Sequence, residues 1–384
     1  MKKFIIAVLA VSVIGMFSMT ASAAESVAGG FEASGHVMAG MGYQHQNNKP
    51  ATEATFDDQY FSFAGPIGRY VNSAGPKEDH LEFFVDELEL DLMKSFGENI
   101  RLRADIDFGR FNSGSNLYVG GGAIDLEQAY ATANIPLGNG IEFMLGRFNV
   151  PIGFESVDAS ENDTISKSIL IRSGIRPTNT TGLKFYYAFS DLVDLHFYLA
   201  NRLTRDNMRA KINDIPSLGF RLGFNWGEQG NESTFGISAF FGPEHDVDSK
   251  KHFTMGTDLD LNWWVTESFA LGLEGIFRKD NAVNAVAANM MTFGGLLNAK
   301  YLFSDVWDGT LKFAMANQNK ANNGQWDFIG GGVKQSVYEV SLAGNYAIAD
   351  GAKLKLEGRG DILKPSGGGT QYVYGGALAF AYDF

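Results

Sequence analysis

Charged side chains occupy every second position in three stretches of the sequence, with apolar or small residues between them. Successive side chains of a β-strand point to opposite faces, so each stretch predicts a strand with one charged face and one apolar face. Groups of both signs that face a common wet lumen would set a field across it and act on passing ions and polar solutes. We therefore expect them to line a pore, although solvating a polar wall is the alternative for any single residue. The set is Glu87, Glu89, Asp91, Arg101, Arg103, Asp105, Asp107, Lys353, Lys355, Glu357 and Arg359.

A long segment, Asn149 to Thr181, carries acidic residues first and basic residues after them. Loops of this length without obvious secondary structure are usually functional or disordered. We expect the segment to fold into the lumen as a constriction and to set its acidic groups against Arg101 and Arg103. A surface flap is the alternative. The residues concerned are Glu155, Asp158, Glu161, Asp163, Lys167 and Arg172.

Enzymatic, metal-dependent and nucleic-acid-binding functions find little support in the sequence. The six histidines lack a metal-ligand spacing such as HExxH, and none has a placed serine partner, so we expect no catalytic residue, metal site or cofactor. Glu244, Asp246 and Asp248 could catch calcium, but without a Gly-turned ligand loop a solvated acidic loop is the expectation. The formal net charge of -13 opposes nucleic-acid binding, which needs a basic surface.

Strand-like alternation recurs along the whole chain and predicts about sixteen strands, an even number as in bacterial barrels. The first is expected near Ser34 to Gln44 and the last over Gln371 to Phe384. Short connections alternate with longer ones, as in a barrel with short periplasmic turns. The predicted fold is an all-β, transmembrane antiparallel β-barrel with an aqueous lumen. A soluble sandwich is opposed by the many charged faces opposite aromatic ones. The remaining expected strands lie around 87–92, 100–108, 125–135, 140–148, 182–190, 192–201, 217–226, 233–241, 253–264, 268–278, 290–303, 310–317, 337–348 and 352–362.

The N-terminus has the layout of a secretory signal peptide. Lys2 and Lys3 precede an apolar run from Phe4 to Phe17 and a small-residue site at 21–23. A membrane-anchoring helix is the alternative, but the apolar run is shorter than the roughly 20 residues that a bilayer span requires. We expect cleavage after Ala23, which leaves 24–384 as one barrel domain in the outer membrane of a Gram-negative bacterium.

The leader, the alternating strands, the long third external segment and the terminal Phe384 together resemble a general bacterial porin. The runs GRFNVPIGFES, from Gly146 to Ser156, and SKSILIRSGIRPTNTTGLKFYYAFSD, from Ser166 to Asp191, are similar to the β-barrel porin family described as OmpL-like. The resemblance implies a homotrimer in outer-membrane lipid that passes ions and small polar solutes. It also implies that Phe384 is read by the outer-membrane assembly machinery. A structural or adhesive barrel without general transport is the alternative function.

Overall fold

The computed structural model describes residues 25–27, 30–47, 79–108, 124–203, 215–244, 253–281, 289–319, 334–366 and 370–384. The expected signal peptide, 1–23, lies outside these residues and stays a prediction. Of the acidic group at 244–248, only Glu244 is described. No helix among the described residues is long and apolar enough to cross a membrane.

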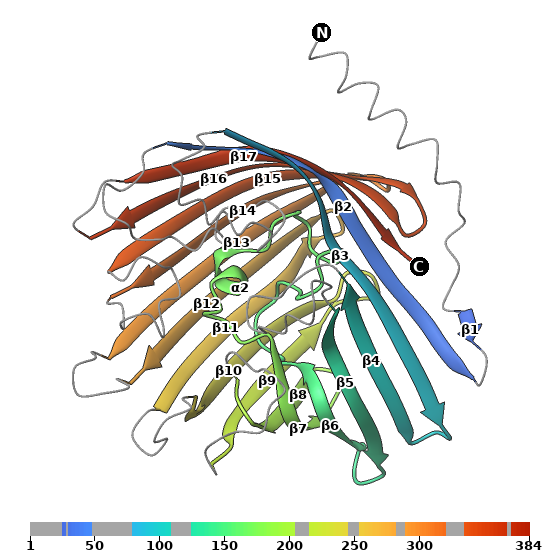
Figure 1. The fold of residues 1–384 in the computed structure, drawn as a ribbon. Helices are drawn as coiled ribbons and strands as arrows, with labels where there is room; N and C mark the ends of the chain where they lie inside the picture. The colour runs from blue at the N-terminus through green and yellow to red at the C-terminus, as the bar shows by residue number, and fades with distance from the viewer. Residues whose placement is uncertain are drawn as a thin grey trace.

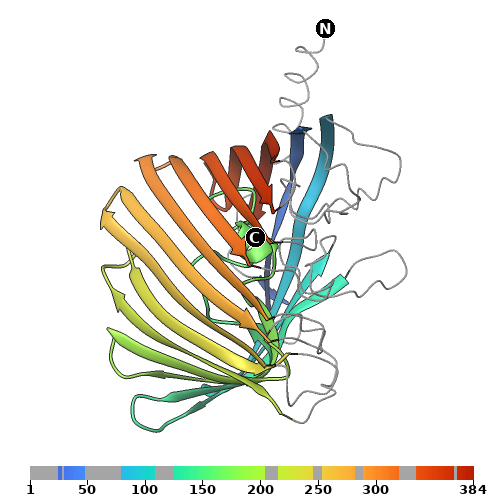
Figure 2. The ribbon, with the colours of Figure 1, turned by 90° about the vertical axis from the view of Figure 1, so that its left-hand side faces the viewer.

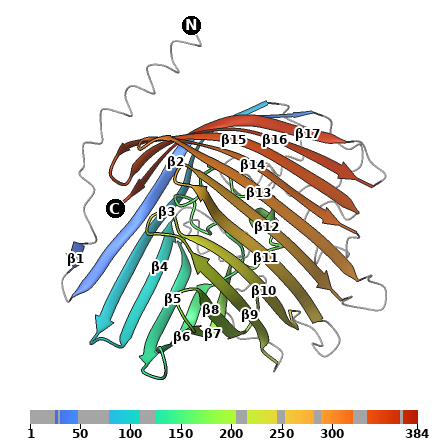
Figure 3. The ribbon, with the colours of Figure 1, turned by 180° about the vertical axis from the view of Figure 1, so that it is seen from behind.

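Sixteen antiparallel strands, β2 to β17, form a closed barrel (Figures 1 and 3). Each strand pairs with the next in sequence, and β17 pairs with β2 to complete the ring. A further three-residue strand, β1 (Glu25–Val27), pairs with the start of β2. The barrel strands are β2 (Phe31–Asn47), β3 (Asp79–Phe96), β4 (Ile100–Phe108), β5 (Ile124–Ile135), β6 (Ile141–Asn149), β7 (Asn179–Ala188), β8 (Val193–Ala200), β9 (Ser217–Trp226), β10 (Ser233–Pro243), β11 (Phe253–Thr266), β12 (Phe269–Asp280), β13 (Met290–Ser304), β14 (Trp307–Gln318), β15 (Gln335–Ala349), β16 (Ala352–Pro365) and β17 (Gln371–Asp383).

The predicted all-β barrel is confirmed, and each of its sixteen strands overlaps a stretch that alternation had indicated. Several strands run further than their apolar alternation. β3 begins at Asp79, where that residue pairs with His45 of β2, well before the charged ladder that predicted the strand. Backbone pairing does not require apolar side chains, so strands continue into polar sequence that hydropathy alone reads as loop.

The wall of the barrel is apolar outside and charged inside. The side chains of Leu342 and Leu356 are 65% and 62% exposed on the outer face, whereas those of Glu87 and Glu89 are 2% exposed inside. This is the inverse of a water-soluble sandwich, whose charged faces point outward. An apolar exterior is stable where the surroundings are lipid, and closure leaves no unpaired strand edge there.

The segment 150–178, called the inner loop here, lies inside the ring of strands with the short helix α2 (Ile169–Arg172) near its middle (Figures 1 and 2). Its first residues, Val150 and Ile152, pack with Phe148, Tyr198 and other apolar side chains of the wall between β6 and β10. The loop therefore enters the lumen along this side of the barrel.

Two further apolar clusters hold the inner loop against the opposite side. Ile169 and Leu170 of α2 pack on inward-facing residues of β12 to β17, including Leu296. Ala159 and Ile165 pack on β2, β3 and the small residues Ala377, Ala379 and Ala381 of β17. The alternation of small and aromatic residues in the last strand thus places its small face inward, where loop atoms fill the space.

The last residue takes part in closing the barrel. The backbone amide of Gly35 donates to the carbonyl of Phe384 at 2.9 Å, and the amide of Phe384 donates to the carbonyl of Gly35 at 2.8 Å. The Phe384 ring also lies against Gly35, where an added Cβ would come within 3.0 Å of it.

Deleting Phe384 should lower the amount of folded barrel in membrane fractions, because the deletion removes the terminal ring and both backbone bonds to Gly35. Heat-modifiable electrophoretic mobility of membrane fractions measures the folded amount. Phe384→Ala keeps the backbone bonds and separates the contribution of the ring, and Phe303→Ala, at an exposed aromatic beside a short turn, serves as the control. Wild-type assembly of the truncated chain would contradict the prediction.

Candidate functional site

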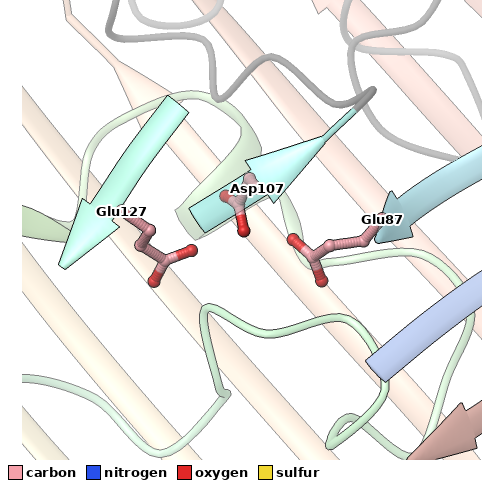
Figure 4. A group of neighbouring side chains, drawn as sticks. All are labelled: Glu87, Asp107 and Glu127. Carbon is pink, nitrogen blue, oxygen red and sulfur yellow. The ribbon is translucent and has the colours of Figure 1, made fainter. Parts of the chain in front are cut away.

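One side of the lumen is an acidic wall formed by β3, β4 and β5. Glu87 and Glu89 of β3, Asp107 of β4 and Glu127 of β5 are all 2–3% exposed. In Figure 4 the carboxylates of Glu87, Asp107 and Glu127 point toward one another from three neighbouring strands. One oxygen from each of these three lies within 4.8 Å of the others.

Two β-bulges concentrate the acids on this wall. The register of β2 with β3 shifts between Met38 and Ala39, which leaves Asp86 as an extra residue of β3. The register of β4 with β5 shifts between Asp105 and Ile106, which leaves Glu127 as an extra residue of β5. A bulge lets two adjacent side chains share a face. Asp86 therefore faces inward beside Glu87, and Glu127 beside Gln128, and all four are buried.

The inner loop contacts the acidic wall near Glu87. The amide of Ala159 donates to Glu87 Oε2 at 2.6 Å, and His36 Nε2 lies 3.0 Å from the same oxygen. Lys167 Nζ is 3.8 Å from Glu87 Oε1 and also donates to the carbonyl of Val157. Burial, with the nearby charges of Glu127 and other acids, raises the pKa of the Asp158 carboxyl to about 8 against the opposing effect of Lys167.

A second wall, called the basic wall here, lies on β14 and β16 with Glu339 of β15 between them, and β17 and β2 separate it from the acidic wall. Glu339 Oε2 accepts from Arg172 Nη2 at 2.7 Å and from the amide of Ile169 at 3.1 Å. Lys312 Nζ and Arg359 Nη2 lie 3.6 Å and 3.7 Å from the Glu339 carboxylate. The start of α2 is thereby held by a buried carboxylate that three cations surround.

Main-chain and hydroxyl groups of the inner loop complete this contact. Lys355 Nζ donates to the carbonyls of Asn162 at 2.6 Å and Ser160 at 3.1 Å. Glu357 accepts from the amide and hydroxyl of Ser166 at 2.8 Å and 2.6 Å. Loop atoms, more than solvent, therefore satisfy the cations of this wall.

The expectation that the acids of the inner loop face Arg101 and Arg103 is wrong. Arg103 pairs with Asp91 at 3.3 Å and with Asp105 at 2.7 Å, both on the wall itself, and Arg101 is exposed. Both arginines lie next to the short turn at 97–99, whereas the loop contacts this wall further along the strands, near Glu87.

The acids of the loop pair with other groups. Glu155 pairs with Lys312 at 3.3 Å and Asp163 with Lys300 at 2.6 Å, and Glu161 accepts from Ser156 Oγ at 2.6 Å. Both lysines lie on β13 and β14, across the barrel from Arg103, so Glu155 and Asp163 face a different wall from the expected one. Asp158 and Lys167 lie at the acidic wall, but near Glu87 and Glu127 and not at the two arginines.

The burial of the other expected pore residues depends on their position along the strands. Glu87, Glu89, Asp105, Asp107, Lys355, Glu357 and Arg359 are buried inside the barrel. Asp91, Arg103 and Lys353 are half-buried nearer the short turns.

Glu127 and Asp86 are the inward acids that alternation did not place, because each sits at a bulge. The adjacent acids Asp86 and Glu87 were the available signal, since a strict period of two cannot put neighbours on one face.

A cavity of about 260 Å³ remains between the inner loop and the wall of β11 to β14. Glu155, Asp163, Lys300 and Lys312 are among its lining residues, so charges of both signs border it. Further round the wall, Arg221 of β9 donates to both carboxylate oxygens of Asp260 on β11. The guanidinium of Arg221 lies over Gly236, in the space that a Cβ would occupy, so a larger residue at 236 would displace the end of the Arg221 side chain.

The family model described as "Putative beta-barrel porin-2, OmpL-like" matches residues 30–382. Solved structures similar to this chain include the outer membrane channel DcaP of Acinetobacter baumannii, with 11% identity, a TM-score of 0.62, and coverage of 94% of this chain and 100% of that one. An anion-selective porin from Comamonas acidovorans has 10% identity, a TM-score of 0.56 and coverage of 92% and 100%. The trimer form of OmpT of Vibrio cholerae has 9% identity, a TM-score of 0.55 and coverage of 92% and 99%. At these identities the structures show a shared fold. No curated protein matches the chain.

Glu339→Gln should loosen the inner loop, because the substitution leaves Arg172, Lys312 and Arg359 around a neutral amide. Removing one partner of a buried ion pair typically costs about 3–5 kcal/mol. We expect a lower thermal midpoint of the refolded barrel and faster trypsin cleavage after Lys167 or Arg172. Glu232→Gln, at an exposed position of a short turn, is the matched control. Equal cleavage of Glu339→Gln and wild type would show that this carboxylate does not hold the loop.

Proposed function

The chain belongs to the family described as "Putative beta-barrel porin-2, OmpL-like", and we propose that it is an outer-membrane diffusion channel for ions and small hydrophilic solutes. One observation carries the proposal: the inner loop lies across the lumen between an acidic wall and a basic wall. A barrel of sixteen strands is too wide to be filled by its own wall side chains, so a segment inside it sets the size of the opening.

The pore-lining role of the charged ladders follows from this arrangement. Acids of β3 to β5 and bases of β14 and β16 lie on different parts of the ring, which supports a field within the narrow part of the lumen. The cavity bordered by Glu155, Asp163, Lys300 and Lys312 is the part of the pathway on the short-turn side of the inner loop. No reacting group is needed for passage, so the protein acts as a channel without catalysis.

Cations are the preferred ions in this proposal. The basic side chains Lys312 and Lys355 are bound to loop oxygens, and Arg172 is paired with Glu339. On the acidic wall, Asp107 Oδ1 and Glu127 Oε2 accept no hydrogen bond from the described residues. Negative charge is therefore less compensated than positive charge along the lumen.

A structural or adhesive barrel is the second candidate, and the tight packing of the inner loop favours it. Three apolar clusters and several buried ion pairs hold the loop in place, as they would in a closed barrel. Conductance separates the two functions, because a closed structural barrel passes no current.

The proposal extends to partners and location. The apolar outer face suits outer-membrane lipid, and Phe384 suits recognition by the assembly machinery. A homotrimer is proposed because a solved structure of similar fold, OmpT of Vibrio cholerae, has a trimer form. Insertion would then follow export by the leader at 1–23.

Deleting Glu155 to Asp163 should raise the single-channel conductance in planar bilayers several-fold, because the deletion removes the loop segment that faces Lys300 and Lys312. Asp305→Asn, at an exposed position of a short turn, controls for a mere change in charge. Unchanged conductance after the deletion would show that the inner loop does not constrict the pore. A silent wild-type protein would favour the structural barrel.

The reversal potential across a potassium chloride gradient should have the sign of cation preference for the wild-type barrel. With EDTA in both solutions, Asp107→Asn should move the permeability ratio toward unity, because it removes one negative charge from the acidic wall. Asp308→Asn, near the short turn between β13 and β14, provides a comparison at a distance from that wall. A wild-type potential of the chloride-preferring sign would overturn the assignment.

A further inference from the structure

Five carboxylates meet where the acidic wall and the inner loop touch. Oxygens of Glu87, Asp107 and Glu127 lie within 4.8 Å of one another, and so do oxygens of Glu89, Glu127 and Asp158. The two groups share Glu127. Figure 4 shows that the first three side chains converge from separate strands, and the second group adds a carboxylate of the loop.

Several of these oxygens are buried and unpartnered. Asp107 Oδ1, Glu127 Oε2, Glu89 Oε2 and Asp158 Oδ1 accept no hydrogen bond from the residues that the structure describes. Asp107, Glu127 and Glu89 are each at least 97% buried. A buried carboxylate without a partner is strongly destabilising unless a positive charge or a donor reaches it. The free oxygens therefore point to a missing cationic ligand, which a solvated acidic patch would not require.

The hydrogen-bond donors and cations near this cluster contact mainly Glu87. His36 and the amide of Ala159 both contact Glu87 Oε2, and Lys167 lies 3.8 Å from Glu87 Oε1. Arg103 pairs with Asp91 and Asp105 instead. Arg101 is exposed, and Arg147 of β6 donates from Nε to the main-chain carbonyl of Glu127 at 3.0 Å. Asn179 Nδ2 donates to Glu127 Oε1 at 3.3 Å. No described residue donates to Glu127 Oε2 or to the named oxygens of Glu89, Asp107 and Asp158.

We propose that Glu87, Asp107 and Glu127 bind a hard divalent cation of the calcium type, with Glu89 and Asp158 as further ligands from the wall and the loop. Carboxylate oxygens are the ligands that calcium prefers, whereas zinc and softer metals favour imidazole and thiolate. Two oxygens that each lie 2.3–2.6 Å from one calcium ion are at most about 5 Å apart. The 4.8 Å limit within each group meets this condition.

The cation would attach the inner loop to the wall. Glu127 belongs to both groups, so an ion bound there is next to Asp158 of the loop and Asp107 of β4. The neighbouring bond from the Ala159 amide to Glu87 already fixes the loop at this level. The site is a property of the folded barrel and stands whether or not the barrel conducts.

Calorimetric titration of the full barrel, refolded in detergent and stripped with EDTA, tests the site with calcium chloride as the probe. We expect one calcium ion per chain and a higher thermal midpoint when calcium is present, because a ligand that binds only the folded state stabilises it. Glu127→Gln and Asp107→Asn should each weaken binding about tenfold or more, since even the loss of an outer-shell partner costs 10–100-fold in metal affinity. Asp191→Asn, at an exposed acid in a short turn, should bind as the wild type does.

The outcomes separate this site from other sources of binding. Absence of calcium binding by the wild type overturns the proposal, and so does equal binding by the wild type and both site variants, which would place the ion in another acidic segment. Competition by potassium chloride at equal ionic strength would show diffuse charge attraction and also overturn it. Heat-modifiable mobility confirms folding of each variant, and if one variant does not fold, the wild-type isotherm and the other variant decide.

Discussion

The closed ring of backbone hydrogen bonds is the constraint on which the rest of the structure depends. Because β17 pairs with β2, each of the sixteen barrel strands has a neighbour on both sides, and no edge is left on the barrel. Side chains in such a wall have only two directions, outward or inward. With an apolar exterior, the charges of the chain must gather inside, and the interior becomes an environment that only polar or paired groups can share. The ladder of Lys355, Glu357 and Arg359 is a direct result.

This charged interior determines how the inner loop is held. A loop in an apolar core would leave its backbone groups unpaired, whereas here Lys355 binds its carbonyls and Glu357 its amide at Ser166. Apolar packing supplies the remaining contacts through α2 and Ile165. The two kinds of contact alternate along the loop, which explains how an irregular segment is positioned within a wide barrel. The acidic wall differs, because several of its oxygens find no partner there.

Much of the fold could be read from the sequence because a strand wall repeats one simple rule. Alternation located all sixteen strands, and the even number with short and long connections gave their order. The rule fails where a strand departs from a period of two, as at Asp86 and Glu127, since hydropathy does not mark a bulge. Alternation also cannot predict which residues contact each other across the lumen. Which cation Glu155 meets depends on the path of the loop, and Lys312 lies 157 positions away from it in the chain.

The small inward face of β17 has a consequence for the order in which the protein folds. Ala377, Ala379 and Ala381 form one floor beneath Ala159 and Ile165, and that floor is made by the last residues of the chain. Ala159 and Ile165, in the middle of the chain, therefore reach their final packing only once the C-terminal strand is in place beside β2. Final packing of this part of the inner loop is coupled in this way to completion of the wall.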